Sequence, residues 1–467
     1  MKKVIFLLLD GARYDCLNRY LDLGHLPNVD KIIKNNGSNS SAISVFPSTT
    51  GPAYVPFLTG LYPGNMNMPG IRWFNKIQFS KNESDSGAHR SYVGIGSIFF
   101  NTDLKKSKKT MFEIVKKSRS IFNEITRGLD SKYNMTKISK IYYKMKSHFS
   151  GSSDIDSVAM EKLLSAIDSE AEFIFCCLHG LDSNSHIYGF DHDIVLQSYK
   201  SFDYNLGIVL SKLENNNELN DTLLIITSDH GHSNTLTHID LVEFLESRNF
   251  RVLSYPFILN KYYRDINASV MVSGNSMAHI YLRKDFNWEK KYTFIDSEKL
   301  IDSLLKINGI DLVMALNQKN HIIIKSDRGL AVLEEKENLL RYQPLENDPF
   351  GYPKMNELLS SDDVLSQTYN TEYPDALIQI VQIFKSNRCG DIVVSADSGF
   401  DLRKKYEYPE HKSSHGSLQK SHMFVPLIMN KRIKQEHIRT VDLFPTILDY
   451  LNKEIANDID GKKLNVY

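Results

Sequence analysis

Cysteine is scarce in this chain of 467 residues, which has four, three of them in or beside apolar runs. That number and placement exclude a dense disulfide framework and indicate reduced core cysteines in a cytoplasmic protein. A net charge is also lacking, since 56 basic residues balance 56 acidic ones, so no global field favours a nucleic acid polymer or an anionic membrane surface. No apolar run approaches the roughly 20 residues that a membrane span requires.

The N-terminus, Met1–Lys3 followed by the apolar run Val4–Leu9, has some features of a signal peptide. The run is short, Asp10 and Arg13 follow it at once, and no small-residue cleavage site is present. We therefore expect Val4–Leu9 to form the first core strand, and we predict a cytoplasmic protein that no membrane anchors.

Three apolar runs lead to an aspartate, and two of those aspartates lie near a histidine. The runs are Val4–Leu9 before Asp10, Phe173–Leu178 before Asp182 and His186, and Leu223–Thr227 before Asp229 and His230. Short continuous apolar runs are typical of strands buried on both faces of a parallel sheet, where ligands bind beyond the carboxyl ends. Three carboxylates at one edge would repel each other without cations between them, so the pattern predicts two divalent metal ions and a metallohydrolase.

The pattern predicts an α/β fold, with a mostly parallel central sheet flanked by helices and an inserted smaller α+β cap domain. We expect residues 1–250 to be the first part of the core, 251–373 the cap, and 374–467 the second part, with a core strand at Ile392–Ala396. A Lys-rich segment at about 101–153 has helical spacing. It is either a solvated helical insertion, which we favour, or a basic lid over an anionic substrate.

The candidate metal ligands are weak signals when taken one at a time. Asp182 and His186 have the i, i+4 spacing that places two side chains on one helix face, but such pairs are usually structural. Asp229 and His230 follow a strand directly, where a turn lets neighbouring side chains converge. His415, in a polar loop, would by itself be interpreted as a surface histidine.

The candidate nucleophile lies in the segment Phe46–Pro52. Pro52 fits the first turn of a helix, and Thr50 would lie at the N-terminus of that helix. Thr50 is then either an ordinary N-cap or a hydroxyl that attacks phosphorus where free backbone N–H groups hold the phosphate oxygens. Local sequence does not decide between these roles.

The order and spacing of these pieces resemble the alkaline phosphatase superfamily, most closely its type I phosphodiesterase and nucleotide pyrophosphatase family. The matching motifs are Leu9–Arg13, Leu26–Asp30, Phe46–Thr50, Thr59–Gly64, Asp182 with His186, Thr227–Gly231, His415–Gly416, Asp442–Leu448 and Asp460–Gly461. They cover residues 1–100, 170–235 and 390–465 and are specific as an ordered set.

The resemblance implies two metal sites, one formed by Asp182, His186 and His415, and the other by Asp10, Asp229, His230 and Thr50. Zinc is the usual metal of the family, and manganese is an alternative because oxygen-rich sites accept it. In the implied reaction Thr50 attacks the phosphorus of a small phosphate ester, and water hydrolyses the resulting phosphothreonine.

Two departures from the family pattern concern substrate recognition. Many nucleotide-cleaving relatives have an aromatic residue after the nucleophile and an asparagine two positions later, where this chain has Gly51 and Ala53. Nucleotide specificity therefore does not follow. Replacement base platforms are Tyr54, Trp73 and Phe74, although core packing is the commoner role of such residues, and candidate phosphate donors are Arg72 and His232.

Other functions stay open at this point. A phosphomonoesterase differs from a phosphodiesterase only in the groups around the non-bridging oxygens. A phosphotransferase similar to phosphoglycerate mutase usually has serine as nucleophile, and a sulfatase would need a Cys-x-Pro-x-Arg segment, which we do not find. A non-catalytic metal-binding protein of the same fold would have no physical reason to keep all seven candidate ligands.

Overall fold

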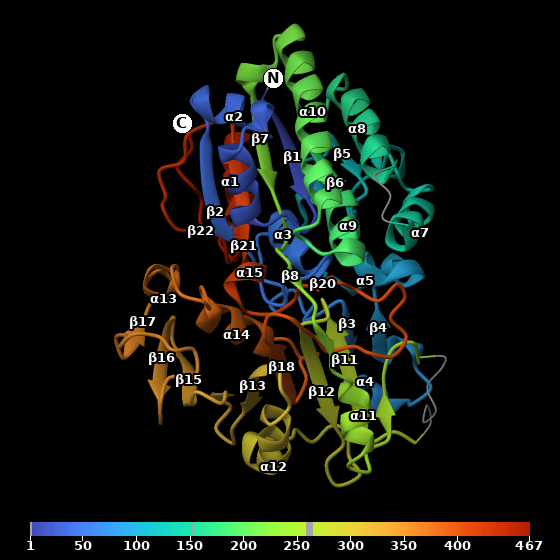
Figure 1. The fold of residues 1–467 in the computed structure, drawn as a ribbon, viewed down its shortest axis with the longest axis vertical. Helices are drawn as coiled ribbons and strands as arrows, with labels where there is room; N and C mark the ends of the chain where they lie inside the picture. Colours follow the sequence, from blue (N-terminus) through green and yellow to red (C-terminus); the bar gives the residue numbers. More distant parts are fainter. Residues whose placement is uncertain (1, 151–153, 258–264) are drawn as a thin grey trace.

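The computed structural model describes residues 2–150, 154–257 and 265–467, and it contains two large β-sheets, one above the other in Figure 1. The upper sheet has seven strands, in the order β22 (Ile438–Arg439), β2 (Ser38–Ile43), β21 (Phe424–Met429), β7 (Thr222–Thr227), β1 (Lys3–Leu9), β6 (Phe173–Leu178) and β5 (Ser118–Ile121). Within the described residues, no helix is both long enough and apolar enough to cross a bilayer.

The upper sheet is mostly parallel. Strand β21 pairs antiparallel with both of its neighbours, β2 and β7, and every other pairing in this sheet is parallel. The inner strand β1 is buried along its whole length, and Phe6 packs against Phe175 of β6 with ring centroids 4.9 Å apart. A strand that is apolar on both faces needs covering layers on both sides, as the sequence predicts.

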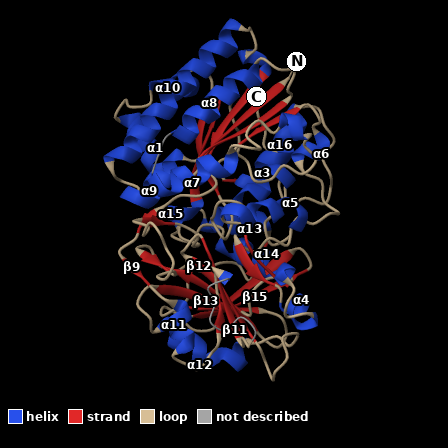
Figure 2. Cartoon of the chain, turned by 90° about the vertical axis from the view of Figure 1, so that its right-hand side faces the viewer, coloured by secondary structure: helices blue, strands red, loops and turns tan. Residues whose placement is uncertain are grey.

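Helices supply those layers on both faces of the upper sheet, as Figure 2 shows. One side carries α1 (Tyr14–Asp22), α8 (Asp154–Ile167), α9 (Gly180–Tyr188) and α10 (Asp193–Asn215), and the other carries α3 (Val55–Thr59), α6 (Met111–Ile114) and α16 (Leu443–Tyr450). Helix α2 (Pro27–Lys34) contacts α10, and Pro27 occupies its first turn. The α/β class predicted from the sequence is confirmed.

The lower sheet is mostly antiparallel, with β10 and β11 as its one parallel pair in the described chain. Its order is β10 (Val252–Leu253), β11 (Ala268–Ser273), β12 (Met277–Leu282), β18 (Ile392–Ala396), β13 (Ile310–Leu316), β14 (Ile322–Lys325), β15 (Leu330–Lys336), β16 (Leu339–Pro344) and β17 (Leu358–Leu359). Its flanking helices are α11 (Leu241–Glu246), α12 (Phe294–Leu305), α13 (Ser361–Thr368) and α14 (Ala376–Phe384).

The strand Ile392–Ala396 lies in a different place from the one that the sequence predicts. It is β18, in the middle of the lower sheet, where it pairs antiparallel with β12 and β13. A five-residue apolar strand covered on both faces has the same pattern in either sheet, which is why the prediction was wrong. The division of the chain into a core and an inserted cap stays a proposal.

The Lys-rich segment also differs from the expected helical insertion. Its apolar residues divide between the short helix α6 and the strand β5, which extends the upper sheet by pairing with β6. Helix α7 (Lys140–Ser150) follows. The segment therefore supplies an edge strand of the upper sheet, β5, between the short helix α6 and the longer helix α7.

Smaller elements connect the two sheets. They are β3 (Arg72–Phe74), β4 (His89–Ser91), β8 (Ser233–Asn234), β9 (Thr237–His238), β19 (Phe400–Asp401), β20 (Ser413–Ser414), α4 (Lys76–Lys81), α5 (Phe100–Asp103) and α15 (Lys420–Met423). Because β1, β2, β6 and β7 run in one direction, the residues that follow them meet at a single edge, between the two sheets.

Candidate active site

The nucleophile candidate and the residues after β1 and β7 lie together. Thr50 follows β2 and precedes a 3₁₀ turn, Pro52–Tyr54, that continues into α3. Its hydroxyl Oγ1 lies 3.2 Å from Asp10 Oδ1 and 3.1 Å from His230 Nε2. His230 Nε2 is in turn 3.4 Å from Asp229 Oδ2.

A second group forms around the carboxylate of Asp182 on helix α9. Asp182 Oδ1 lies 3.2 Å from His186 Nε2, 2.9 Å from His232 Nε2 and 3.9 Å from His415 Nε2. The two groups adjoin, since the rings of His230 and His415 stack with centroids 3.6 Å apart. All seven predicted metal ligands are thus brought into one site, from the segments that follow the four strands β1, β2, β6 and β7 and from a late loop.

The imidazoles are oriented by backbone carbonyl groups. His186 Nδ1 donates to Ser413 O at 2.7 Å, and His415 Nδ1 donates to Ser48 O at 2.8 Å. A ring whose Nδ1–H is bound in this way presents its Nε2 lone pair to the site. The same arrangement orients histidines that bind metals in proteins.

Asp229 is the least compensated of the three carboxylates. Burial, followed by the charges of Asp10 and Asp182, raises the pKa of Asp229 well above the usual range. Its Oδ2 atom is buried without a hydrogen-bond partner among the described residues. Burial and Asp182 raise the pKa of Asp10 too, but the hydrogen bond and charge of His179 outweigh them and lower it.

The charge of Asp182 is compensated by histidine. Burial raises the pKa of Asp182, but His186 and His232 reverse this and hold it well below the usual range. Burial lowers the pKa of His186, and Asp182 more than offsets the effect, to about 9. Burial lowers the pKa of His232 to about 4 and that of His415 well below its usual value, so both rings are neutral near pH 7.

These residues fit divalent metal ions. Three groups each bring their ligand atoms within 4.8 Å of one another: Asp182, His186 and His232; Asp182, His230 and His415; and Asp10, Asp229 and His230. Imidazoles oriented by backbone carbonyl groups beside three buried carboxylates are a ligand set that zinc and manganese accept. His232, predicted as a phosphate donor, lies among the candidate ligands.

His179 belongs to the site although the sequence analysis does not select it. It directly follows β6, just as Asp10 follows β1, and that position at a strand end was a usable signal. Its Nδ1 lies 2.5 Å from Asp10 Oδ2, and its Nε2 donates to Phe122 O at 3.1 Å. His179 thus holds the Asp10 carboxylate in position.

The aromatic residues suggested as base platforms are buried. Tyr54 is 0% exposed and donates its hydroxyl to Asp10 Oδ2 at 3.1 Å, below the site. Trp73 is also 0% exposed, and its Nε1 donates to Tyr92 at 2.9 Å, while Phe74 packs in the core of the lower sheet. None of these rings offers a free face for a ligand, so each has the packing role.

A cavity of about 790 Å³ opens over the site. Its wall includes Thr50, Asp182 and the predicted phosphate donor Arg72, which lies on β3 between the two sheets. Helix α7 of the Lys-rich segment contributes Lys140 and Lys144 to the same wall. The cavity is large enough for a small molecule with substituents on two sides of a phosphate.

The type I phosphodiesterase/nucleotide pyrophosphatase family model matches residues 4–418, most of the chain. The chain belongs to this family. Membership places it among the hydrolases that act on phosphoric ester bonds and confirms the family resemblance seen in the motifs. A comparison with curated proteins finds no match.

Solved structures of the same fold cover nearly the whole chain. Murine ectonucleotide pyrophosphatase/phosphodiesterase 5 is 14% identical, with a TM-score of 0.58 over 99% of this chain and 98% of the murine one. Phosphonoacetate hydrolase from Sinorhizobium meliloti, in complex with phosphonoacetate, is 16% identical, with a TM-score of 0.59 over 96% of each chain. At these identities the likeness establishes the fold alone.

Proposed function

We propose that this chain is a two-metal phosphodiesterase that acts on a small phosphate ester through a phosphothreonine intermediate at Thr50. The observation that carries the proposal is the position of the Thr50 hydroxyl, within 3.2 Å of Asp10 and 3.1 Å of His230, where the two ligand groups adjoin. A threonine that only caps a helix is not expected to lie within hydrogen-bond distance of a carboxylate and an imidazole that follow two other strands.

The side chains prepare the hydroxyl for attack. Thr50 donates to Asp10, whose other oxygen is held by His179 and Tyr54, so the carboxylate keeps a fixed orientation. Two bound divalent ions would lower the pKa of the hydroxyl and of a water, and would neutralise the phosphate oxygens. Asp182, His186 and His415 would hold one ion, and Asp10, Asp229 and His230 the other.

Two related proposals supplement this function. Zinc is favoured because imidazoles form about half of the ligand set, with manganese as the alternative. A cytoplasmic location is supported by the free cysteines, of which Cys16, Cys176 and Cys177 are buried thiols. Cell fractionation tests the location, and metal analysis of the protein as purified tests the metal.

The decisive experiment measures metal content and turnover together. We expect about two metal ions per chain, and a higher kcat/KM for bis-p-nitrophenyl phosphate than for p-nitrophenyl phosphate. Acid quenching during turnover of bis-p-nitrophenyl phosphate, followed by peptide mass spectrometry, is expected to find a p-nitrophenyl phosphoryl group on Thr50, because the attack expels one p-nitrophenolate and leaves the other ester group on phosphorus. A protein that binds no metal and hydrolyses neither ester contradicts the proposal, and a preference for the monoester makes it a phosphomonoesterase.

A further inference from the structure

The large cavity is lined by five lysine and arginine side chains: Arg72, Arg90, Lys140, Lys144 and Arg403. Three of them have close carboxylate partners. Arg90 Nε lies 2.8 Å from Asp103 Oδ2, and both Lys140 and Lys144 are paired with the nearly buried Glu124. Their charges are already compensated within the protein, so they offer little to a ligand.

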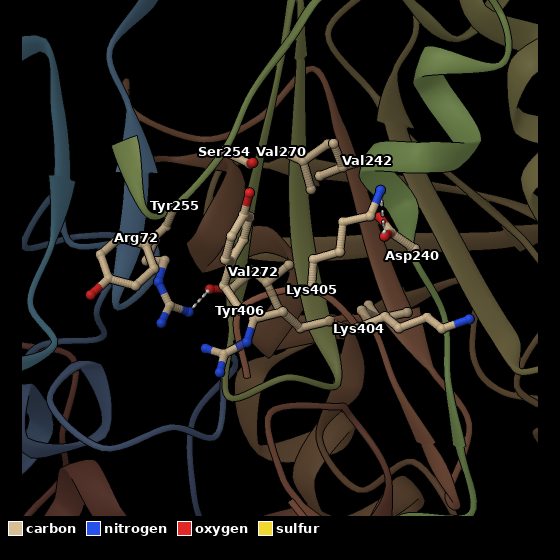
Figure 3. Close-up of a pocket in the computed structure, with 12 residues that line it drawn as sticks. Arg72, Asp240, Val242, Ser254, Tyr255, Val270, Val272, Lys404, Lys405 and Tyr406 are labelled. Carbon is tan, nitrogen blue, oxygen red and sulfur yellow. Dashed lines mark hydrogen bonds and ion pairs between the residues drawn. The ribbon is translucent and has the colours of Figure 1, made fainter. Parts of the chain in front are cut away.

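Arg72 differs from these three residues. It is 4% exposed, and no described carboxylate lies within ion-pair distance of it. Its Nη1 donates to Val272 O at 2.9 Å, and its guanidinium lies over the ring of Tyr255, 4.7 Å from the centroid, as Figure 3 shows. The Nε–H group is buried and finds no acceptor among the described residues. A buried cation with an unused donor is a strong indication of a missing anion.

Arg403 lines the same cavity as Arg72 and shares a smaller hollow of about 60 Å³ with it, the pocket drawn in Figure 3. Its closest carboxylate contact among the described residues is long, 3.7 Å from Nη2 to Glu407 Oε1, and its Nε is also buried without an acceptor in that part of the chain. Burial, followed by the positive charge of Arg403, lowers the pKa of Arg72 to about 9. An anion between the two guanidinium groups would remove this repulsion.

The two arginines are connected to the reacting site through the backbone. Val272, which accepts from Arg72, lies on β11, and the turn after that strand bridges to His415 through Asn275. Thr50, Asp182, Arg72 and Arg403 therefore line one continuous cavity.

We propose that Arg72 and Arg403 form an anion subsite beside the reacting phosphate, and that the substrate is a small phosphate ester that also carries a carboxylate. The inference rests on the proposed function, because the first anion occupies the site at Thr50. Guanidinium groups bind such anions through paired N–H donors, and Arg72 and Arg403 each have an unused one.

Calorimetry of the metal-loaded protein with matched, non-hydrolysable ligands tests the subsite. Phosphonoacetate, 3-phosphonopropionate and 4-phosphonobutyrate are each compared with the alkylphosphonate that lacks the carboxylate, and the series scans the unknown distance. We expect at least one carboxylated member to bind about tenfold more tightly than its partner. Arg72→Gln is expected to remove this difference, measured against the affinity of the same variant for the matching alkylphosphonate, while Arg72→Lys keeps part of it.

Lys404→Gln is the matched control, because Lys404 is an exposed residue next to Arg403 whose side chain points away from Arg72 in Figure 3. It should keep the full carboxylate preference. Arg403→Gln repeats the test on a more exposed side chain if Arg72→Gln does not fold. The proposed subsite is wrong if alkylphosphonates bind but no carboxylated ligand binds more tightly than its alkylphosphonate partner. It is also wrong if the tighter binding of a carboxylated ligand persists in both Arg72→Gln and Arg403→Gln. If no phosphonate binds, the proposed phosphate site itself fails.

Discussion

Two clusters of carboxylates and histidines lie near each other in this molecule, and they differ in how their charge is compensated. The Asp10 cluster (Asp10, Asp182, Asp229, His186, His230, His232 and His415) has only histidines as ion-pair partners of its carboxylates in the described chain. The Asp401 cluster (Asp401, Glu407 and His238) contains ligand atoms equally close together. Proximity of such atoms therefore does not by itself identify a metal site.

The Asp401 cluster is held together by hydrogen bonds from a side-chain amide and a backbone N–H. Asn275 Nδ2 donates to Asp401 Oδ2 at 2.8 Å and to Glu407 Oε1 at 2.6 Å, and the backbone N–H of Arg403 donates to Asp401 Oδ1 at 2.8 Å. The side-chain amide of Asn275 thus bridges the two carboxylates, and Arg403 Nη2 lies 3.7 Å from Glu407 Oε1. In the Asp10 cluster Asp229 Oδ1 accepts from the backbone N–H of Gly11, and no side-chain amide or arginine of the described residues bonds to its carboxylates. We infer that the Asp10 cluster binds metal and that the Asp401 cluster stabilises the contact between two loops.

Thr50→Ala is expected to have the largest effect. Removal of the nucleophile should lower kcat for bis-p-nitrophenyl phosphate on the order of 10³-fold or more, with metal content and melting temperature close to wild type. Activity within a few-fold of wild type would show that another group attacks phosphorus.

Asp229→Asn and Asp401→Asn test the comparison of the two clusters directly. Asp229→Asn should reduce the bound metal by about one ion per chain and lower kcat about 100-fold or more, because it removes a charged ligand. Asp401→Asn should keep both ions, because its carboxylate is held by an amide. Metal analysis by mass spectrometry after gel filtration measures both. Loss of metal in the Asp401 variant would make the second cluster a metal site.

The smallest expected effect concerns pH and the Asp401 cluster. Burial, followed by the charge of Glu407, raises the pKa of Asp401 well above the usual range. The folded protein then keeps a proton that the unfolded chain releases near pH 4, so stability falls as pH rises from about 4 through the raised pKa. Asp401→Asn should remove this loss and reduce the fall in melting temperature between pH 5 and pH 8 by about 2 °C. An unchanged difference between the two pH values would mean that Asp401 titrates normally in the fold.

Strand ends were the most informative feature of the sequence. Asp10, Asp182 and Asp229 could be selected because parallel strands bring their carboxyl ends to one edge, and the structure places all three there. His179 follows β6 in the same way, three residues before Asp182, so its position was an equally usable signal.

The strands themselves were predictable only in part. The apolar residues of β18 have the pattern of a parallel core strand, and they lie in the antiparallel sheet. The strand β5, Ser118–Ile121, is short and mostly polar, so nothing in its pattern distinguishes it from a helical insertion. Sheet membership depends on pairing partners that lie far away in the sequence.

The sequence by itself determined the family, the α/β class and the residues that supply carboxylate, imidazole and hydroxyl groups, because these follow from local patterns and their order. Only the tertiary structure decided which charged groups are compensated. Lys140 and Lys144 are paired with Glu124. Arg72 instead contacts the carbonyl of Val272 and the ring of Tyr255, and no described carboxylate lies within ion-pair distance of it. These ion pairs form between residues that are distant along the chain, so no local sequence pattern encodes them. The tertiary structure therefore decides which buried charge keeps no partner and can bind a ligand.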